Sequence, residues 1–192
     1  MTTRASSFAS LWASLAAGAL IACGGSSKTP DHPPGPAPGT EGVAVLESRS
    51  GSNVTGEARL LDTGDGVQVT VTVAGATPGK HGVHVHQVGD CSAPDAKSTG
   101  DHFNPETHQH GAPGVPEHHV GDFGNIEVGD DGNGTLTLVV PGATLTPGPM
   151  SLTDRAVVVH ASEDDFTTQP SGNSGDRVAC GVIHSQEKRA SL

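Results

Sequence analysis

Short runs in which apolar and polar residues alternate make up most of the chain after its first 41 residues. Residues 67–73 read Val-Gln-Val-Thr-Val-Thr-Val, which places the valines on one face of an extended strand. Helical periodicity is nearly absent, and Gly, Asn, Asp and Pro bound the runs, as is typical of an all-β sandwich or barrel. The pattern predicts eight strands, at residues 43–48, 54–62, 66–74, 81–88, 123–128, 134–140, 155–160 and 178–184.

Two tight turns and two long loops interrupt the predicted strands. Residues 62–66 and 130–134 carry the Asp, Asn and Gly residues that tight hairpins need. Residues 90–120 and 161–177 show no strand pattern and are rich in Gly, Pro, His and Asp. Loops of that length in a compact domain are usually functional or disordered. Because much of the candidate chemistry falls in them, we expect functional loops.

The first 41 residues follow a different pattern. Arg4 precedes an apolar run over residues 8–21, which is the build of a secretory signal and is shorter than the about 20 apolar residues of a transmembrane helix. The sequence Leu-Ile-Ala-Cys at residues 20–23 resembles a bacterial lipobox, in which the signal is cut before a cysteine that carries lipid. A plain cleaved signal followed by an incidental cysteine is the alternative.

Three parts are therefore predicted: a lipoprotein signal peptide at residues 1–22, a lipidated Cys23 with a Pro/Gly-rich linker to residue 41, and one domain at residues 42–192. The linker has almost no apolar residues and cannot bury enough surface to fold. The domain is long enough for its own core. We expect an exported bacterial lipoprotein that faces the periplasm or is anchored in the outer membrane, and that contacts membrane only through its lipid.

Composition limits the core and the partners. With one Trp, no Tyr and four Phe, the core must consist mainly of Val, Leu, Ile and Ala. The chain has 10 basic and 21 acidic residues, a formal net charge of −11. Such a balance argues against nucleic acid or an anionic membrane surface as a partner. A monomer and a homodimer are both compatible with the sequence.

Histidines are concentrated in one part of the chain, since nine of the eleven fall between His81 and His160. His84 and His86 lie two apart in a predicted strand, so their imidazoles point to the same face and form half a metal site. Taken alone, this pair is more typical of the polar face of an exposed strand. The next loop adds more histidines and Asp122. Three imidazoles with one carboxylate suit Zn²⁺, and four imidazoles suit copper, but spacing alone does not separate ligands from bystanders.

Five sequence blocks follow one another in the domain: Gly-Val-His-Val-His at 82–86, Gly-Asp-His-Phe-Asn-Pro at 100–105, His-Val-Gly-Asp-Phe-Gly-Asn at 119–125, Val-Val-His at 158–160 and Gly-Asn-Ser-Gly-Asp-Arg-Val-Ala-Cys-Gly-Val-Ile at 172–183. They resemble, in order, the signature blocks of the copper/zinc superoxide dismutases, and the resemblance covers essentially all of residues 42–184. The resemblance implies an eight-stranded antiparallel Greek-key β-barrel or sandwich with two long functional loops. Superoxide dismutases are themselves counted among the β-sandwich architectures.

The resemblance also implies the residues of the site. Copper would be held by four histidines: His84, His86, His102 and His160. Zinc would be held by His102, His110, His119 and Asp122, so that His102 bridges the two metals. The second carboxylate, Asp164, would join a copper histidine to a zinc histidine. A cavity beside copper would have Arg177 to orient the substrate and Ser171 in its wall. His81 matches a structural histidine, whereas no ligand position matches His32, His108, His118 or His184.

The two cysteines of the domain, Cys91 and Cys180, match the family's intrasubunit disulfide. Export to an oxidising compartment permits that bond, and two free buried thiols are the alternative. The chain departs from cytosolic eukaryotic members in a longer disulfide loop. Its last loop is shorter and lacks their cluster of charged residues. Both departures resemble exported bacterial members.

The implied reaction converts two superoxide ions and two protons into dioxygen and hydrogen peroxide. Copper would cycle between Cu(II) and Cu(I), zinc would be structural, and His102 would supply a proton. The acidic chain would repel superoxide at long range, but the local field of the metals and Arg177 can outweigh this repulsion; superoxide dismutases are themselves an example of electrostatic steering. Two alternatives are a related lipoprotein that binds copper and zinc without turnover and a purely structural surface domain. The intact ligand positions disfavour both.

Overall fold

The computed structural model describes residues 39–186. The predicted signal peptide, Cys23, His32 and nearly all of the linker lie outside these residues. Within the described range, no helix is long and apolar enough to cross a membrane. The strands are β1 (Glu41–Ser48), β2 (Thr55–Asp62), β3 (Gly66–Ala74), β4 (Gly79–His86), β5 (Asp122–Val128), β6 (Gly134–Pro141), β7 (Ala156–His160), β8 (Arg177–Val182) and β9 (His184–Gln186).

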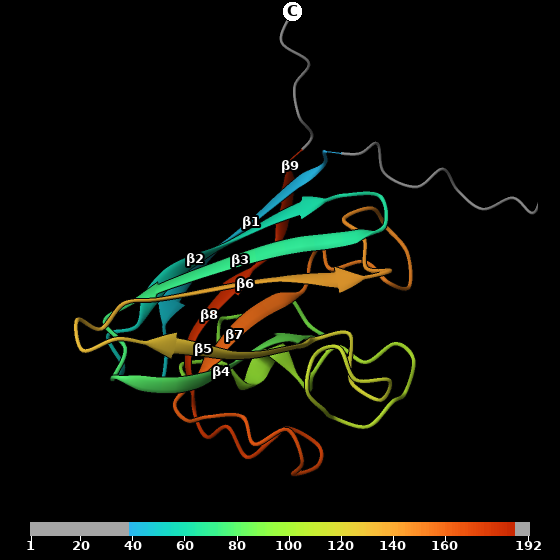
Figure 1. The fold of residues 1–192 in the computed structure, drawn as a ribbon. Helices are drawn as coiled ribbons and strands as arrows, with labels where there is room; N and C mark the ends of the chain where they lie inside the picture. The colour runs from blue at the N-terminus through green and yellow to red at the C-terminus, as the bar shows by residue number, and fades with distance from the viewer. Residues whose placement is uncertain (1–38, 187–192) are drawn as a thin grey trace, which may run out of the picture. The chain divides into compact units, whose positions relative to one another are not determined.

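Eight of these strands close into an antiparallel barrel. Their order is β2-β3-β6-β5-β4-β7-β8-β1, and an additional pairing of β1 with β2 closes the ring. Neighbours in sequence pair as hairpins except where β3 pairs with β6, β4 with β7 and β8 with β1, which is a Greek-key arrangement. The predicted fold class is confirmed. The short strand β9 is additional and pairs with the beginning of β1 (Figure 1).

Hairpin turns form where the sequence predicts them. The backbone N–H of Gly64 donates to Asp62 Oδ1 at 2.9 Å, and the N–H of Thr63 donates to the carbonyl of Gly66 at 2.9 Å. In the second turn, the N–H of Gly129 donates to the carbonyl of Asn133 at 3.0 Å. Side-chain carboxylates of Asp thus replace backbone acceptors where the chain reverses.

The ends of three strands differ by two residues from the predicted ones, and the other ends agree to within one residue. β4 covers residues 79–86, because backbone bonds beyond His86 go to the loop at Thr99 and Asp101. The predicted strand 178–184 is divided at Ile183. The N–H of Ile183 donates to the carbonyl of Arg155, and its C=O accepts the N–H of Asp154, so neither group pairs with a neighbouring strand. β1 begins at residue 41, one residue before the predicted domain boundary.

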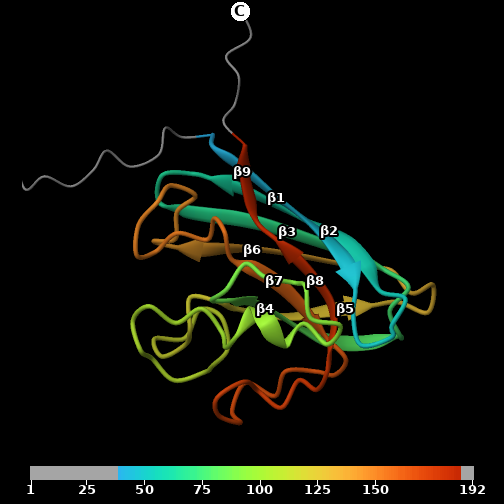
Figure 2. The ribbon, with the colours of Figure 1, turned by 180° about the vertical axis from the view of Figure 1, so that it is seen from behind.

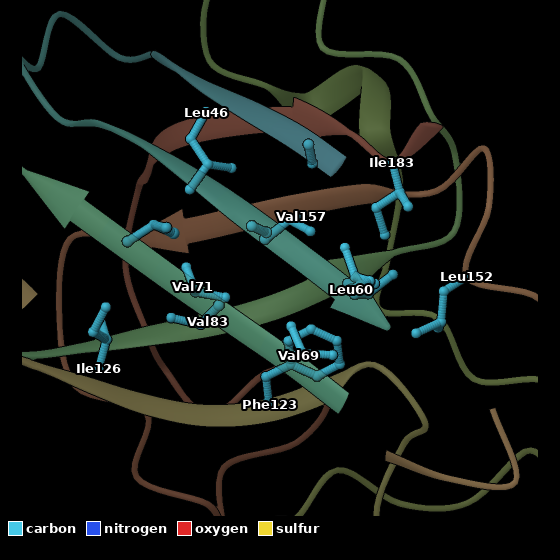
Figure 3. Close-up of a cluster of buried hydrophobic side chains, with 14 of the residues drawn as sticks. Leu46, Leu60, Val69, Val71, Val83, Phe123, Ile126, Leu152, Val157 and Ile183 are labelled. Carbon is cyan, nitrogen blue, oxygen red and sulfur yellow. The ribbon is translucent and has the colours of Figure 1, made fainter. Parts of the chain in front are cut away.

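The core fills the barrel with aliphatic side chains. Val67, Val69 and Val71 of β3 are fully buried, which confirms the alternation in the sequence. Side chains from β1, β2, β4, β5 and β7 meet them in the interior, with Phe123 the largest fully buried one (Figure 3). Burying each such side chain contributes about 1.5–3 kcal/mol.

The two long loops lie on the side of the barrel that β4, β5, β7 and β8 form, away from β2 and β3 (Figures 1 and 2). The first loop contains one short 3₁₀ helix, η1 (Lys97–Thr99), which the sequence did not predict. The ends of β4 and β7 lie next to both loops. These ends carry three of the predicted copper ligands, His84, His86 and His160.

Candidate metal centre

Six buried histidines and one aspartate converge from the ends of β4 and β7, the beginning of β5 and the first long loop. One group consists of His84, His86, His102 and His160, and a second of His84, His102, His110 and Asp122. Within each group, one potential ligand atom per residue lies within 4.8 Å of the others. The first group is the predicted copper set. The second differs from the predicted zinc set by containing His84 in place of His119.

Hydrogen bonding separates His84 from His119. The Nε2 atom of His84 is bound to Asp164 Oδ2 at 2.7 Å, and its other ring nitrogen lies among the first group. The Nδ1 atom of His119 lies 3.4 Å from Asp122 Oδ1 and has no hydrogen-bond partner. On chemical grounds His119 therefore belongs with Asp122, and His84 with the first group.

Six ring nitrogens in this cluster are buried without a hydrogen-bond partner: Nδ1 of His84, His110 and His119, and Nε2 of His86, His102 and His160. In His84, His86, His110 and His160, the opposite ring nitrogen contacts an acceptor behind the ring. Nδ1 of His86 donates to the carbonyl of Gly100 at 2.8 Å, and Nδ1 of His160 to that of Gly175 at 3.1 Å. An outward donor fixes the tautomer and leaves the inward lone pair available, which is the arrangement that metal ligation requires.

Asp122 contacts all three histidines of the predicted zinc site. Its Oδ1 atom lies 2.9, 3.0 and 3.4 Å from the Nδ1 atoms of His102, His110 and His119, respectively. Its Oδ2 atom accepts the backbone N–H groups of Gly111 at 3.1 Å and His119 at 2.8 Å. One carboxylate oxygen is thus held by the loop while the other faces three imidazoles, a donor set that suits tetrahedral Zn²⁺.

His102 faces both groups. Its Nδ1 atom is directed at Asp122, whereas its Nε2 atom is free and belongs to the first group. The ring stacks on that of His84, with centroids 3.9 Å apart. A histidine in this position can present one nitrogen to each of two metal ions.

Backbone irregularities direct the strand histidines. The register shifts between Val83 and His84 in β4 and between Val159 and His160 in β7. Such bulges re-aim a side chain and are common beside active sites. Val83 and Val85 alternate with His84 and His86 at the end of β4, so the valines join the core on one face of the strand and the histidines join the metal centre on the other.

The first loop is bound to β4 by backbone hydrogen bonds. The N–H of Phe103 donates to the carbonyl of Val85 at 2.7 Å, and the N–H of Val85 to that of Gly121 at 2.8 Å. A side chain at Gly121 would collide with the Val85 carbonyl, so this close approach requires glycine. His102 is positioned by this contact rather than by a strand of its own.

The buried Asp164 carboxylate joins the two sides. It accepts from His84 Nε2 at 2.7 Å and from His110 Nε2 at 2.9 Å, as the sequence resemblance implies. The backbone of Asp164 is itself bound at both polar groups by the side-chain amide of Asn125, at 2.8 and 2.9 Å. A Cβ atom at Gly172 would overlap the carboxylate.

Two side-chain amides were missed by the sequence analysis. Asn125 binds the backbone of Asp164, and Gln169 binds the backbone of His110 at both its N–H and its C=O, each at 2.8 Å. Asn125 falls within a family-like block, but nothing in the pattern indicates what it binds. Gln169 lies 59 residues from His110 and carries no local signal.

A cavity of about 470 Å³ opens beside the first group of histidines. Arg177 and Ser171 line it together with His86, His102 and His160. Nη1 of Arg177 donates to the carbonyl of Ala96 and to Oγ1 of Thr99, both at 2.9 Å. Helix η1 therefore holds the guanidinium at the cavity wall.

Burial and hydrogen bonding shift the pKa values in the cluster. Burial lowers the pKa of His86 and His160, and it lowers that of His102 to about 4, so these rings are neutral near pH 7. For His110, burial also lowers the pKa, but hydrogen bonds to Asp122 and Asp164 outweigh it and raise the pKa to about 9.

Cys91 and Cys180 form a disulfide with a Cα–Cα distance of 5.8 Å, which confirms the predicted pairing. The bond joins the first loop to β8. Nε of Arg49 donates to the carbonyl of Cys91 at 2.8 Å, and the N–H of Ser50 to that of Pro94 at 2.7 Å. The beginning of the loop is thus fixed to the barrel at three points.

Besides His119, four histidines of the described range lie outside both groups. His81 is buried, with Nδ1 against the carbonyl of His160 and Nε2 against that of Thr77, each at 2.8 Å. His184 is exposed on β9. His108 and His118 are half-buried rather than fully solvated, because Nδ1 of each contacts a backbone carbonyl of the loop.

Comparisons with known proteins agree with one another. A family model described as copper/zinc superoxide dismutase (SODC) matches residues 54–183. A curated relative, superoxide dismutase (Cu-Zn) 2 of Brassica juncea, is 47% identical over 150 residues, which cover 74% of this chain and 96% of the relative. A crystal structure of the clock protein EA4 has a TM-score of 0.69 and 38% identity, and the match covers 78% of this chain and 97% of that one. The matched range 54–183 contains every residue of the two histidine groups.

Proposed function

The chain belongs to the copper/zinc superoxide dismutase family, and on that premise we propose which of its residues carry the chemistry. The protein converts superoxide into dioxygen and hydrogen peroxide with copper and zinc as cofactors. We assign copper to His84, His86, His102 and His160, and zinc to His102, His110, His119 and Asp122. The six inward nitrogens without a protein partner are the observation that carries this assignment.

Bound copper supplies one-electron redox chemistry, while zinc has none. The protein residues supply geometry and protons. His102 would hold a proton at Nε2 only while that nitrogen is not bound to copper, and would then donate it to the peroxide product as a general acid. Asp164 would bind His84 and His110 at Nε2, the ring nitrogen opposite to the inward Nδ1 atom, so that Nδ1 of each ring stays directed at the metal.

Arg177 would bring the anionic substrate to the cavity. Its guanidinium is fixed by two acceptors of η1 and lines the cavity, so a positive charge is present without reorganisation. Burial lowers the Arg177 pKa, but an arginine remains protonated in a protein. Ser171 would form another part of the cavity wall.

Dismutation by the copper- and zinc-loaded protein, measured beside Arg177→Ala and His160→Ala, tests this assignment. We expect reduced turnover after the arginine change and none after the histidine change. Two bound metals per chain without turnover in the parent protein would favour the alternative, a related metal-binding lipoprotein.

We also propose that the protein is exported and anchored by lipid on Cys23. The support is the apolar run with a lipobox-like ending at residues 20–23 and the Pro/Gly-rich sequence after it. The Cys91–Cys180 disulfide fits an oxidising compartment. Mass spectrometry of the membrane-extracted protein should find a diacylglycerol-modified Cys23 at the N-terminus. A mature chain without lipid, or Cys23→Ser protein that stays in the membrane fraction, would contradict the proposal.

A further inference from the structure

One side-chain amide of the second long loop binds a predicted zinc ligand by its backbone. Oε1 of Gln169 accepts the backbone N–H of His110 at 2.8 Å, and Nε2 of Gln169 donates to the backbone C=O of His110 at 2.8 Å. The same histidine is bound at its ring by Asp164. His110 is therefore held at its backbone and at its ring by one loop, residues 161–176, from which no zinc ligand comes.

The segment that carries Gln169 is internally braced. The Asp165 carboxylate accepts the backbone N–H groups of Thr167 at 2.9 Å and Thr168 at 2.7 Å. The N–H of Gly172 donates to the carbonyl of Thr168 at 2.7 Å, and the N–H of Asp165 donates to that of Gly172 at 3.0 Å. If Gln169 moved, the residues from Thr168 to Gly172 would therefore move with it.

The same segment forms part of the cavity wall. Gln169, Pro170 and Ser171 line the cavity together with Arg177. Gln169 thus contacts the zinc side through its amide and the substrate side through the residues that follow it. No other side chain of the described residues hydrogen-bonds both backbone groups of a predicted metal ligand.

We propose that Gln169 is a positioning residue that couples the zinc site to the wall of the substrate cavity. The His110 backbone fixes the side chain of Gln169 by two hydrogen bonds, and this restrains the next two residues, Pro170 and Ser171, in the cavity wall. The same two bonds fix the His110 backbone and so keep its ring directed at zinc. The inference rests on the proposed zinc assignment of His110.

Glutamine suits this role because an amide offers a donor and an acceptor together. Glutamate would keep the acceptor for the His110 N–H but would face its carbonyl with a second oxygen. Methionine keeps the length of the side chain and loses both hydrogen bonds. Gln169 is an exposed residue, so neither change disturbs the core.

The test compares Gln169→Met and Gln169→Glu with the parent protein and with Thr167→Val. Thr167 is an exposed residue of the same loop without a hydrogen bond to His110, which makes it a matched control. Transfer of zinc to a chromogenic chelator should be about tenfold faster in both Gln169 variants, as expected for lost net-stabilising hydrogen bonds. The copper content and the Thr167→Val rate should equal those of the parent.

A second measurement addresses the coupling. Azide serves as a small-anion probe, and its dissociation constant is measured in zinc-loaded and zinc-free copper protein. We expect zinc to tighten azide binding in the parent and to tighten it less in Gln169→Met, because His102 and Asp164 still join the two sites. Cobalt(II) placed in the zinc site should show a changed visible spectrum in the Gln169 variants only.

The inference would be overturned, and the proposed function left intact, if both Gln169 variants released zinc at the parental rate. The same holds if the effect of zinc on azide binding is undiminished in Gln169→Met. A parent protein that binds no zinc would overturn the zinc assignment itself, and the inference with it.

Discussion

Asp164 accepts a hydrogen bond from Nε2 of His110 at 2.9 Å, on the side of the ring opposite to the Nδ1 atom that faces Asp122. This outer carboxylate sets the direction of the ring, so its loss should weaken zinc binding without removing a ligand. Partners of this kind typically change metal affinity by about 10–100-fold.

We therefore expect Asp164→Asn to raise the zinc dissociation constant by about 10–100-fold, as measured by competition with a chelator. Glu163→Gln is the matched control, because this neighbouring carboxylate is exposed and pairs only with Lys80. Equal zinc affinity in Asp164→Asn and the parent would contradict the role of Asp164.

His102 and His108 provide a test of ligands against bystanders. His102 Nε2 is buried without a partner, whereas Nδ1 of His108 contacts the carbonyl of His118 at 3.3 Å outside both groups. His102→Ala should lower the copper and zinc content measured by elemental analysis, since it removes one ligand from each site. His108→Ala should keep both metals, and equal loss in the two variants would refute the assignment.

The sequence predicted most of the fold because its information is local. Alternation in residues 67–73 and the Asp/Gly turns determine strands and hairpins through near neighbours. The division of the last strand at Ile183 depends on a bond to Arg155, 28 residues away, which no local pattern contains. The same reason explains the missed helix η1, whose role is to hold Arg177.

The candidate site was predicted through resemblance more than through chemistry. Histidine spacing indicated a metal centre. His108 and His110 lie only two residues apart, however, and nothing in the spacing says which of them is a ligand. The structure separates them by their surroundings: His110 Nδ1 faces Asp122, whereas His108 points to a backbone carbonyl. Supports from distant residues, such as Gln169, have no signature in a single sequence because any exposed loop amide would look the same.

Arg177→Ala should lower kcat/KM for superoxide while both metals are retained. The change removes a cavity-lining positive charge from a protein of net charge −11. We expect a loss on the order of tenfold and a weaker dependence of the rate on ionic strength; superoxide dismutases are themselves an established example of such steering. Arg59→Ala, which removes an exposed charge paired with Glu57 on β2, is the control. An equal rate in both variants would rule out a local role for Arg177.

Removal of the disulfide should lower the free energy of unfolding. The bond closes a loop with a sequence separation of 89 residues, for which restriction of the unfolded chain contributes about 4–5 kcal/mol. Urea unfolding of the metal-free Cys91→Ala/Cys180→Ala double variant measures the loss. Reductant should destabilise the parent to the same extent and leave the variant unchanged; a variant as stable as the oxidised parent would contradict this estimate.

The stability of the second loop should depend on the ionisation of Asp165. Hydrogen bonds from the Thr168 hydroxyl and from the backbone N–H groups of Thr168 and Thr167 lower the pKa of this exposed carboxyl to about 2. Because the pKa is lower in the folded state than in the unfolded state, where it is about 3.9, the stabilisation is complete above about pH 4 and disappears as the pH falls through 2.

An NMR titration of the Asp165 carboxyl carbon should give a midpoint near pH 2 in the parent protein. Thr168→Val removes the hydroxyl that makes the largest contribution, so it should move the midpoint upward, toward the ordinary aspartate value. Thr63→Val is the control, because its hydroxyl binds a backbone carbonyl in a distant turn. A parent midpoint at the ordinary value would mean that the Asp165 carboxylate does not brace the segment that carries Gln169.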